Sequence, residues 1–146
     1  MKGKDLSGYY DYTVFPLEGL WWISGDIFSF EDRMNWLWTS MIRQPDFVTE
    51  EVFTWAYEQT KKKKPELRLD NVRFESFNEG LCVPMMHVGA YDSEPETVAF
   101  MREFMKENSL IDVMGTERKH HEIYLSDPNR VKAEKLKTVI RHPVER

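Results

Sequence analysis

The residues with the clearest chemical potential form the segment HHEIYL near the carboxyl end of the sequence. Its residues alternate as they do in a β-strand, so His120, Glu122 and Tyr124 are expected on one face. The other face, with Ile123 and Leu125, is expected to meet the helices of the domain. A carboxylate flanked by a histidine and a tyrosine can accept a proton or hold a cation, and Glu122 is therefore the first candidate for a functional residue.

The surroundings of Glu122 decide which chemistry it performs. If aromatic rings such as Trp21 or Trp22 cover its face of the strand, the carboxylate is partly removed from water, and we expect its pKa to be raised. It then attracts a cation or accepts a proton, with Tyr124 beside it. The alternative is a wet second face on which Glu122 is an ordinary solvated charge, and alternation alone favours that alternative.

Aromatic side chains are unusually frequent, because five tryptophans, six tyrosines and nine phenylalanines make up 14% of the chain. Some of these rings are expected to line a binding site rather than fill a core. The neighbours Trp21 and Trp22, and the pair Trp36 and Trp38, are candidates for a cage around a flat or cationic ligand. The alternative is that at least one ring of each pair is ordinary core.

Other kinds of site have no support in the sequence. The histidines, His87, His120, His121 and His142, lack the paired spacing of a zinc site, so we predict no metal. The sequence contains no glycine-rich phosphate loop, nucleophile elbow or dinucleotide-binding motif, and no cofactor is expected. The single cysteine excludes an internal disulfide and lies in an apolar run typical of an inert thiol. Any catalysis is therefore expected to be acid–base chemistry by Glu122.

Charge and hydropathy restrict the partners. The formal net charge of −5 and the pI near 5.4 leave no basic surface for phosphate backbones, so no direct nucleic-acid binding is expected. No stretch approaches the ~20 apolar residues of a membrane helix. The first residues lack the apolar core of a signal peptide. We therefore expect a cytoplasmic protein without a membrane partner, whose partner is a small-molecule ligand.

Hydrophobic periodicity and turn signals predict an α+β fold. Helices are expected at 30–42, 49–64 and 93–108, one or two strands within 9–23, a hairpin of 72–77 with 81–88, and strands at 121–125 and 136–142. Pro84 indicates an edge strand or a bulge. The four lysines that end the second helix either complement the helix dipole, which we favour, or form a phosphate-binding patch.

Four segments together resemble the GyrI-like small-molecule-binding proteins: PLEGLWW from Pro16, MIRQPDFVTEEVFTWA from Met41, GLCVPMMHVGAYDSEPET from Gly80, and KHHEIYLSDPNRVKAEKLKTVIRHPV from Lys119. The resemblance covers nearly the whole chain, and HHEIYLSDP followed by EKLKTVIRHPV is its most specific part. It implies a duplicated strand–helix–strand–strand fold in which antiparallel sheets form a ligand groove between two helices.

The resemblance also implies a type of ligand. In relatives of this type, including the effector-binding domains of multidrug-responsive regulators, the groove holds flat or cationic organic molecules, which meet the glutamate of a Glu-x-Tyr strand. That pattern falls here on Glu122 and Tyr124. Some free-standing members hydrolyse the cyclopropane ring of DNA-alkylating natural products, which is a detoxification. Other members sequester toxins or affect DNA gyrase.

The sequence departs from the family at its start. Members of this subtype carry a further strand and helix before the segment that begins at Tyr9, so residues 1–146 are expected to form a single GyrI-like domain whose first repeat is incomplete. The loss is expected to expose a sheet edge and apolar surface. We therefore expect a homo-oligomer, or a chain truncated relative to its gene, with a more open pocket.

Two functions remain as hypotheses. The first is binding or sequestration of aromatic or cationic molecules such as xenobiotics and toxins, with Trp21, Trp22, Tyr91 and Tyr124 as ring contacts and Glu122 as counter-charge. The alternative is a hydrolase that opens cyclopropane rings, in which Glu122 accepts a proton from water and Tyr124 polarises a carbonyl oxygen of the substrate. Binding alone does not distinguish the two.

Overall fold

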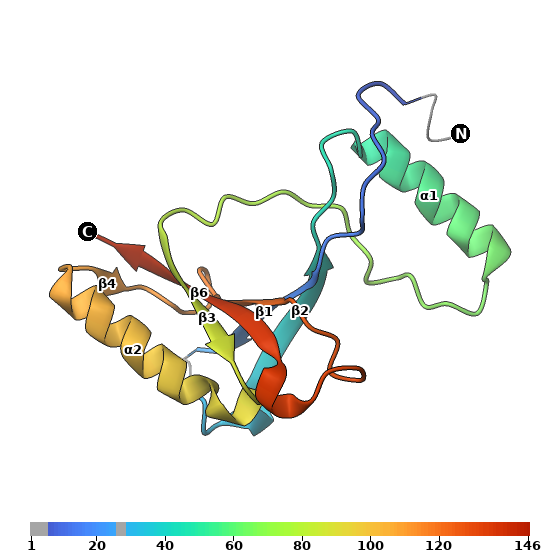
Figure 1. Ribbon diagram of the computed structural model, residues 1–146. Coiled ribbons are helices and arrows are strands. Elements are labelled where there is room, and N and C mark those ends of the chain that lie inside the picture. The colour runs from blue at the N-terminus through green and yellow to red at the C-terminus, as the bar shows by residue number, and fades with distance from the viewer. Residues whose placement is uncertain (1–5, 26–28) are drawn as a thin grey trace. The chain divides into compact units, whose positions relative to one another are not determined.

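The computed structural model describes residues 6–25 and 29–146, which belong to two compact units (Figure 1). The first unit comprises the chain up to Phe15 together with Gln44–Asn78, and the second comprises Pro16–Arg43 together with Glu79–Arg146. In the described part of the chain, none of the helices is long and apolar enough to cross a membrane. The second unit contains every residue predicted for the site.

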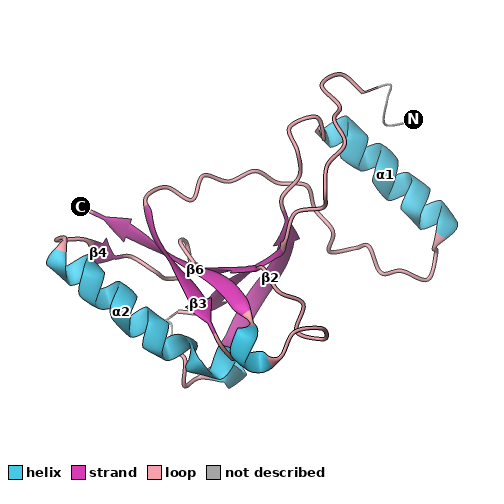
Figure 2. Cartoon of the chain, in the orientation of Figure 1, coloured by secondary structure: helices cyan, strands magenta, loops and turns pink. Residues whose placement is uncertain are grey.

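An antiparallel sheet forms the centre of the second unit (Figure 2). Its strands lie in the order β2-β1-β5-β6-β3, and the short β4 pairs with the end of β6. The strands span Leu17–Ile23 (β1), Trp36–Ile42 (β2), Cys82–Val88 (β3), Ile111–Asp112 (β4), His120–Tyr124 (β5) and Lys137–Glu145 (β6). β5, which carries Glu122, therefore lies in the middle of the sheet.

Helix α2 (Glu94–Glu107) packs on one face of this sheet, chiefly against β3. Pro95 stands in its first turn, where a missing N–H costs no helical hydrogen bond. The core forms where the apolar positions of the helix meet β3 and β6, with Val83, Val98, Met101, Met105, Ile140 and Val144 buried. Full burial of each such side chain contributes roughly 1.5–3 kcal/mol. The helix predicted at 93–108 is confirmed.

Helix α1 (Glu50–Lys63) belongs to the first unit and confirms the helix predicted at 49–64. Thr49 is its N-cap, and the side chain accepts a hydrogen bond of 3.4 Å from the backbone N–H three residues later. Acidic residues occupy the first turn and lysines the last, as the helix dipole favours. None of the helix residues is buried.

Aromatic contacts hold other parts of the first unit together. The Phe47 ring contacts Tyr9, Tyr10 and Tyr12, with centroids 5.1, 5.3 and 5.7 Å away. Of the one or two strands predicted within 9–23, one forms, and it is β1 of the second unit. The tyrosines before it therefore serve ring packing instead of strand pairing.

The helix predicted at 30–42 is wrong. Trp36–Ile42 form β2, which pairs along its whole length with β1, and only a short 3-10 turn at Arg33–Asn35 precedes it. The apolar residues of this segment do lie at helical spacing. However, the aromatic sequence WLW is equally suited to a strand, and β1 supplies the backbone hydrogen bonds that decide between the two.

The first arm of the predicted hairpin is also wrong. Residues 72–77 are exposed and form no strand, whereas β3 pairs with β6 along its whole length. The nine-residue β6 is the stronger partner, because it already lies against β5. Pro84 lies on β3 at an edge of the sheet, as predicted. The α+β class is confirmed.

Candidate functional site

Glu122 lies at the centre of β5 and is only 4% exposed. The strand register places it between Gly19 of β1 and Ile140 of β6, and His120 and Tyr124 share its face, as the alternation predicts. Of the two environments considered for this carboxylate, the structure therefore shows the buried one and not the wet one.

Helix α2 lies on the Glu122 side of the sheet, so the prediction that Ile123 and Leu125 meet the helices is wrong. Ile140, directly opposite Glu122, is part of the core under α2, while Leu125 is 46% exposed. A face with polar side chains can be buried when those side chains satisfy one another. A prediction from alternation assigns polar residues to the solvent face, so it misses this possibility.

Both carboxylate oxygens of Glu122 make short hydrogen bonds. Tyr124 donates its hydroxyl to Oε2 at 2.6 Å, and Nε2 of His120 lies 2.7 Å from Oε1. Trp21 donates its indole N–H to the Tyr124 hydroxyl at 3.0 Å. The tyrosine hydroxyl is thus donor and acceptor at once, and side chains of β1 and β5 are held in one arrangement.

These contacts set the charges of the site. Burial alone raises the pKa of Glu122, but the hydrogen bonds from His120 and Tyr124 outweigh it and hold the pKa below its ordinary value. The raised pKa predicted for this residue is therefore wrong. Burial lowers the pKa of His120, and burial beside the Glu122 charge strongly raises the pKa of Tyr124. The Glu122 carboxylate is thus held between the rings of His120 and Tyr124.

Gly19 makes room for this arrangement. A Cβ atom there would lie 2.7 Å from the indole nitrogen of Trp21 and 3.0 Å from the hydroxyl oxygen of Tyr124. Because non-bonded heavy atoms do not pack that closely, any larger residue would displace Trp21 from Tyr124. In the sequence nothing marks this glycine as part of the site, since its neighbours in space come from β1 and β5.

Glu94, the first residue of α2, brings a second buried carboxylate to the site. One of its oxygens, one oxygen of Glu122 and one ring nitrogen of His120 lie within 4.8 Å of one another. Among the described residues, these three are the ones that could offer a metal ion a common position. His120 and Glu122 lie at hydrogen-bond distance from each other and form an acid–base pair in this arrangement.

Aromatic rings surround the polar centre. The Trp21 ring packs against Trp36 and Trp38, with centroids 5.5 and 6.0 Å away, and Tyr91 stands edge-on to Tyr124 at 6.1 Å. Trp38 is 59% exposed and Tyr91 is 37% exposed. Ring surface is therefore accessible beside a buried carboxylate.

The structure brings together Trp21, Tyr91, Glu122 and Tyr124, which are predicted site residues. It does not bring Trp22 to them, because consecutive strand residues point to opposite faces. The ammonium group of Lys119 lies over the Trp22 ring, 4.4 Å from its centroid. Sequence reasoning missed Glu94, because a glutamate at that position has only the signature of a helix start.

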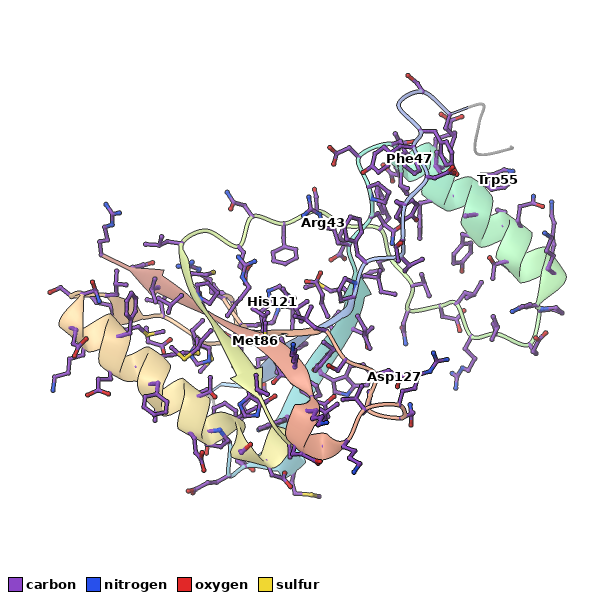
Figure 3. The ribbon with its side chains drawn as sticks, viewed as in Figure 1. Arg43, Phe47, Trp55, Met86, His121 and Asp127 are labelled. Carbon is purple, nitrogen blue, oxygen red and sulfur yellow. The ribbon has the colours of Figure 1, made fainter. Side chains whose placement is uncertain are left out.

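The opposite face of β5 carries a second polar cluster. His121 is 3% exposed, with Nε2 lying 2.7 Å from Glu18 and Nδ1 lying 2.8 Å from Glu79. Arg141 pairs with the other oxygen of Glu79 at 2.7 Å. Burial alone lowers the pKa of His121, but the two carboxylates raise it to about 9. Figure 3 shows His121 and Met86, which the strand register places on this same face.

A hollow of about 410 Å³ lies beside the carboxyl-terminal half of α2. It is lined chiefly by apolar side chains, among them Leu81, Val83, Met85, Phe104, Leu110 and Val144. None of the residues around Glu122 lines it. The hollow is therefore separate from the Glu122 centre.

Comparison with known proteins gives consistent matches. A family model described as the GyrI-like small molecule binding domain matches residues 3–145. The crystal structure of an uncharacterized conserved protein from Listeria innocua is 54% identical and has a TM-score of 0.89, covering 94% of this chain and 67% of that one. Two structures described as hydrolases from Listeria innocua are 51% and 52% identical, each with a TM-score of 0.84, and cover 96% of this chain and 67% and 68% of their own. None of the curated proteins matches the chain.

Proposed function

This chain belongs to the GyrI-like small-molecule-binding family, and we propose that it binds flat aromatic cations against the Glu122 centre. The observation that carries the proposal is a carboxylate that is 4% exposed beside the partly exposed rings of Trp38 and Tyr91. Burial lowers the pKa of His120, which disfavours a histidinium beside that carboxylate. The centre therefore offers a negative charge in a place where water competes weakly.

Charge and ring contacts contribute separately to such binding. A cation about 4 Å from a carboxylate gains roughly 4 kcal/mol at an effective dielectric constant near 20, before its own desolvation is subtracted. Contact with a ring face adds about 0.5–2 kcal/mol. A neutral molecule of the same shape keeps its packing against the rings but loses the attraction to Glu122. Preference for the cation over its neutral analogue is therefore the signature of this site.

The test compares N-methylacridinium, which is permanently charged, with acridine, which is neutral at mildly alkaline pH and has nearly the same shape. Quenching of tryptophan fluorescence reports binding, because Trp21, Trp36 and Trp38 lie at the site. We expect the cation to bind at least about 10-fold more tightly, which corresponds to about 1.4 kcal/mol. Equal affinities of the wild-type protein for the two compounds would contradict the proposal.

Glu122→Gln is the matched variant, because glutamine keeps the shape and one acceptor oxygen but removes the charge. We expect this variant to bind N-methylacridinium and acridine with similar dissociation constants, mainly because it binds the cation more weakly. Glu103→Gln removes an exposed carboxylate of α2 and serves as the control. It is expected to leave the preference for the cation unchanged, since that charge is screened by water.

A hydrolase activity is the second candidate, and the two similar structures described as hydrolases favour it. In this alternative, Glu122 removes a proton from water while the water oxygen bonds to a ring carbon of a cyclopropane conjugated to a carbonyl group. The electron pair of the carbon–carbon bond that breaks moves to the carbonyl oxygen, which Tyr124 polarises. That oxygen then takes up the proton that Glu122 removed, so the product is the ring-opened hydrate.

A mass-spectrometric time course tests this second candidate. A cyclopropane-bearing DNA-alkylating compound is incubated with a small molar fraction of the protein, beside Glu122→Gln. Many equivalents of ring-opened hydrate from the wild type, and none from the variant, would establish turnover and a catalytic role for Glu122. Rates equal to that of buffer for both proteins would exclude that compound as a substrate and leave the binding proposal to its own test.

We also propose that the protein forms a homo-oligomer through β2. This strand ends the sheet on one side, and Leu37 and Ile42 on it are each 43% exposed. A strand at the edge of a sheet that exposes apolar side chains favours pairing with another copy. Sizing chromatography with light scattering measures the oligomeric state, and a monomer at the highest soluble concentration would contradict the proposal.

A further inference from the structure

A row of hydrogen-bonding side chains leads from Glu122 to the protein surface. Nε2 of His120 lies 2.7 Å from Glu122, Nδ1 of His120 lies 2.8 Å from Nε2 of His142, and Nδ1 of His142 lies 3.4 Å from Asp112. Both rings are 0% exposed, whereas the Asp112 side chain is 26% exposed. Strands β5, β6 and β4 thus join a buried carboxylate to one that reaches water.

With neutral histidines, this row holds fewer protons than contacts. The two rings carry one proton each and the two carboxylates carry none, but each of the three contacts needs a proton to be a hydrogen bond. When both rings carry the proton on Nε2, His142 donates to His120 and His120 donates to Glu122. The contact between His142 and Asp112 then has no proton, and it is the longest of the three at 3.4 Å. The distances therefore match the two-proton state.

A third proton satisfies all three contacts without moving a ring. It bonds to Nδ1 of His142, where Asp112 accepts its hydrogen bond. Nε2 of His142 passes its proton to Nδ1 of His120, and Nε2 of His120 passes its proton to Oε1 of Glu122. Each ring loses one N–H bond and gains another, so the net change is one proton taken from water and one O–H bond formed on Glu122. Both rings end with the proton on Nδ1.

We propose that His120, His142 and Asp112 form a proton relay that sets the charge of Glu122 from the protein surface. The consequence for ligands rests on the proposed function, because it concerns the same carboxylate. A cation beside Glu122 favours the two-proton state, and a neutral ligand that accepts a hydrogen bond favours the three-proton state. Glu122 can therefore change its charge while a ligand covers its other side.

Charged and titratable groups face the relay from each neighbouring element. Glu94 of α2 lies near His120 and Glu122, and Tyr124 donates to Glu122. Partial burial raises the pKa of Asp112, but its contact with His142 and a hydrogen bond from a backbone N–H outweigh it, with a smaller contribution from Arg102 of α2. Asp112 is therefore a carboxylate at neutral pH, and it can accept a hydrogen bond from a proton on Nδ1 of His142.

The two histidine rings transfer the third proton, but neither ring binds it as an additional proton in the final state. Burial lowers the pKa of His120, and a positive charge on His142 or on the neighbouring His121 would act in the same direction. The Phe30 ring stands edge-on to His120 at 5.5 Å and supplies no polar group. If packing alone were required, apolar side chains would fill this space at lower cost than two buried polar rings.

Long-range ¹H–¹⁵N NMR of the histidine rings tests the relay in the ligand-free protein, because it distinguishes protons on Nδ1 from protons on Nε2. As the pH falls below neutrality, we expect His120 and His142 to change together, with one common midpoint that lies on the acid side because the pKa of Glu122 is lowered. An infrared carbonyl band of a protonated carboxyl should appear at that midpoint and be missing in Glu122→Gln. A histidine that served structure alone would not show this shared step.

Asp112→Asn removes the charge that holds the third proton on His142. We expect it to lower the common midpoint by about one pH unit or more, because the three-proton state loses the carboxylate that accepts a hydrogen bond from Nδ1 of His142. Asp70→Asn removes an exposed carboxylate of the first unit and should leave the midpoint unchanged. A midpoint in Asp112→Asn equal to that of the wild type would overturn the relay.

Separate midpoints for the two rings, or rings that keep Nε2 protonated while Glu122 gains its proton, would also overturn the relay. These outcomes need only the wild-type protein, so they decide the question even if Asp112→Asn does not fold. Failure of the proposed function looks different, since it appears as equal affinity for N-methylacridinium and acridine and leaves the ring protons as described. Failure of the relay leaves that difference in affinity intact.

Discussion

The two faces of β5 carry adjacent histidines whose electrostatics are opposite. His120 is fully buried beside one carboxylate, and burial dominates, so its pKa is lowered. His121 is almost as buried, but it lies between Glu18 and Glu79, and its pKa is raised to about 9. The two rings expose similarly little surface, but His121 has less deeply buried surroundings and two carboxylate partners, and both differences raise its pKa relative to that of His120.

On the His121 face of the sheet, charged side chains attach the segment before β3 to the sheet, which the Glu122 face does not do. Glu79 precedes β3, and its carboxylate is held by His121 and Arg141. Arg118 donates to the backbone carbonyls of Glu79 and Leu81 at 2.9 Å each. Opposite charges thus fasten the chain before β3 to the sheet. On the other face, the hydrogen bonds described for the Glu122 carboxylate come from His120 and Tyr124 and not from a lysine or an arginine.

Replacing His120 is expected to give the largest loss of stability. His120→Phe keeps a ring of similar shape but removes a hydrogen-bond partner from both Glu122 and His142. Breaking a buried pair by removing one partner costs about 3–5 kcal/mol, and urea denaturation at neutral pH measures this free energy of unfolding. Adding Glu122→Leu to the same chain should recover part of it, since no unpaired carboxylate remains. A loss below about 1 kcal/mol would show that the two groups are not coupled.

A methyl group at Gly19 disturbs the Glu122 face alone. Gly19→Ala places a Cβ 2.7 Å from the Trp21 indole nitrogen, and relieving this overlap is expected to cost about 1–3 kcal/mol. Displacement of Trp21 from Tyr124 should also change the tryptophan emission. Gly115→Ala is the matched control, because no atom lies within 4 Å of a Cβ there. Equal destabilisation by the two substitutions would contradict the close approach at Gly19.

The His121 face should be sensitive to alkaline pH. The pKa of His121 is 6.5 in the unfolded chain and about 9 in the folded one, so the proton stabilises the folded state. This contribution is fully present below pH 6.5 and is lost as the pH rises through 9. Water screens the partly exposed carboxylates, so we expect a loss of about 1–2 kcal/mol, measured by urea denaturation across this range. His121→Gln should flatten the slope, and an unchanged slope would show that the stabilising charge lies elsewhere.

Much of the fold can be predicted from the sequence where an element carries its own pattern. The helix at Glu94–Glu107 and the strand at His120–Tyr124 are of this kind, because their periodicity is long or their alternation strict. Trp36–Ile42 fits a helix and a strand equally well, and its pairing with β1 decides the outcome. β4 has two residues, which is too short for any pattern.

Some residues of the candidate site can also be predicted from a local pattern, and others cannot. The shared face of His120, Glu122 and Tyr124 follows from alternation within one strand. Glu94 and Asp112 belong to other elements, and only long-range packing brings them to that strand. The direction of the pKa shift of Glu122 could not be predicted either. It depends on how close the hydrogen-bond donors lie to the carboxylate, and the sequence does not give these distances.

The smallest expected effect compares two neighbouring tryptophans on β1. Trp21 lies against Tyr124, whereas Trp22 faces the other side of the sheet under Lys119. Trp21→Phe removes a donor and part of the ring surface at the Glu122 centre, so N-methylacridinium should bind about 3- to 10-fold more weakly, which corresponds to roughly 1 kcal/mol. Trp22→Phe should change the affinity by less than about twofold, within the ordinary effect of a surface substitution. The two variants have the same composition and differ by one position, so only the face of the strand separates them. A larger effect of Trp22→Phe would place the ligand on the charged face and reverse the roles assigned to the two sides of the sheet.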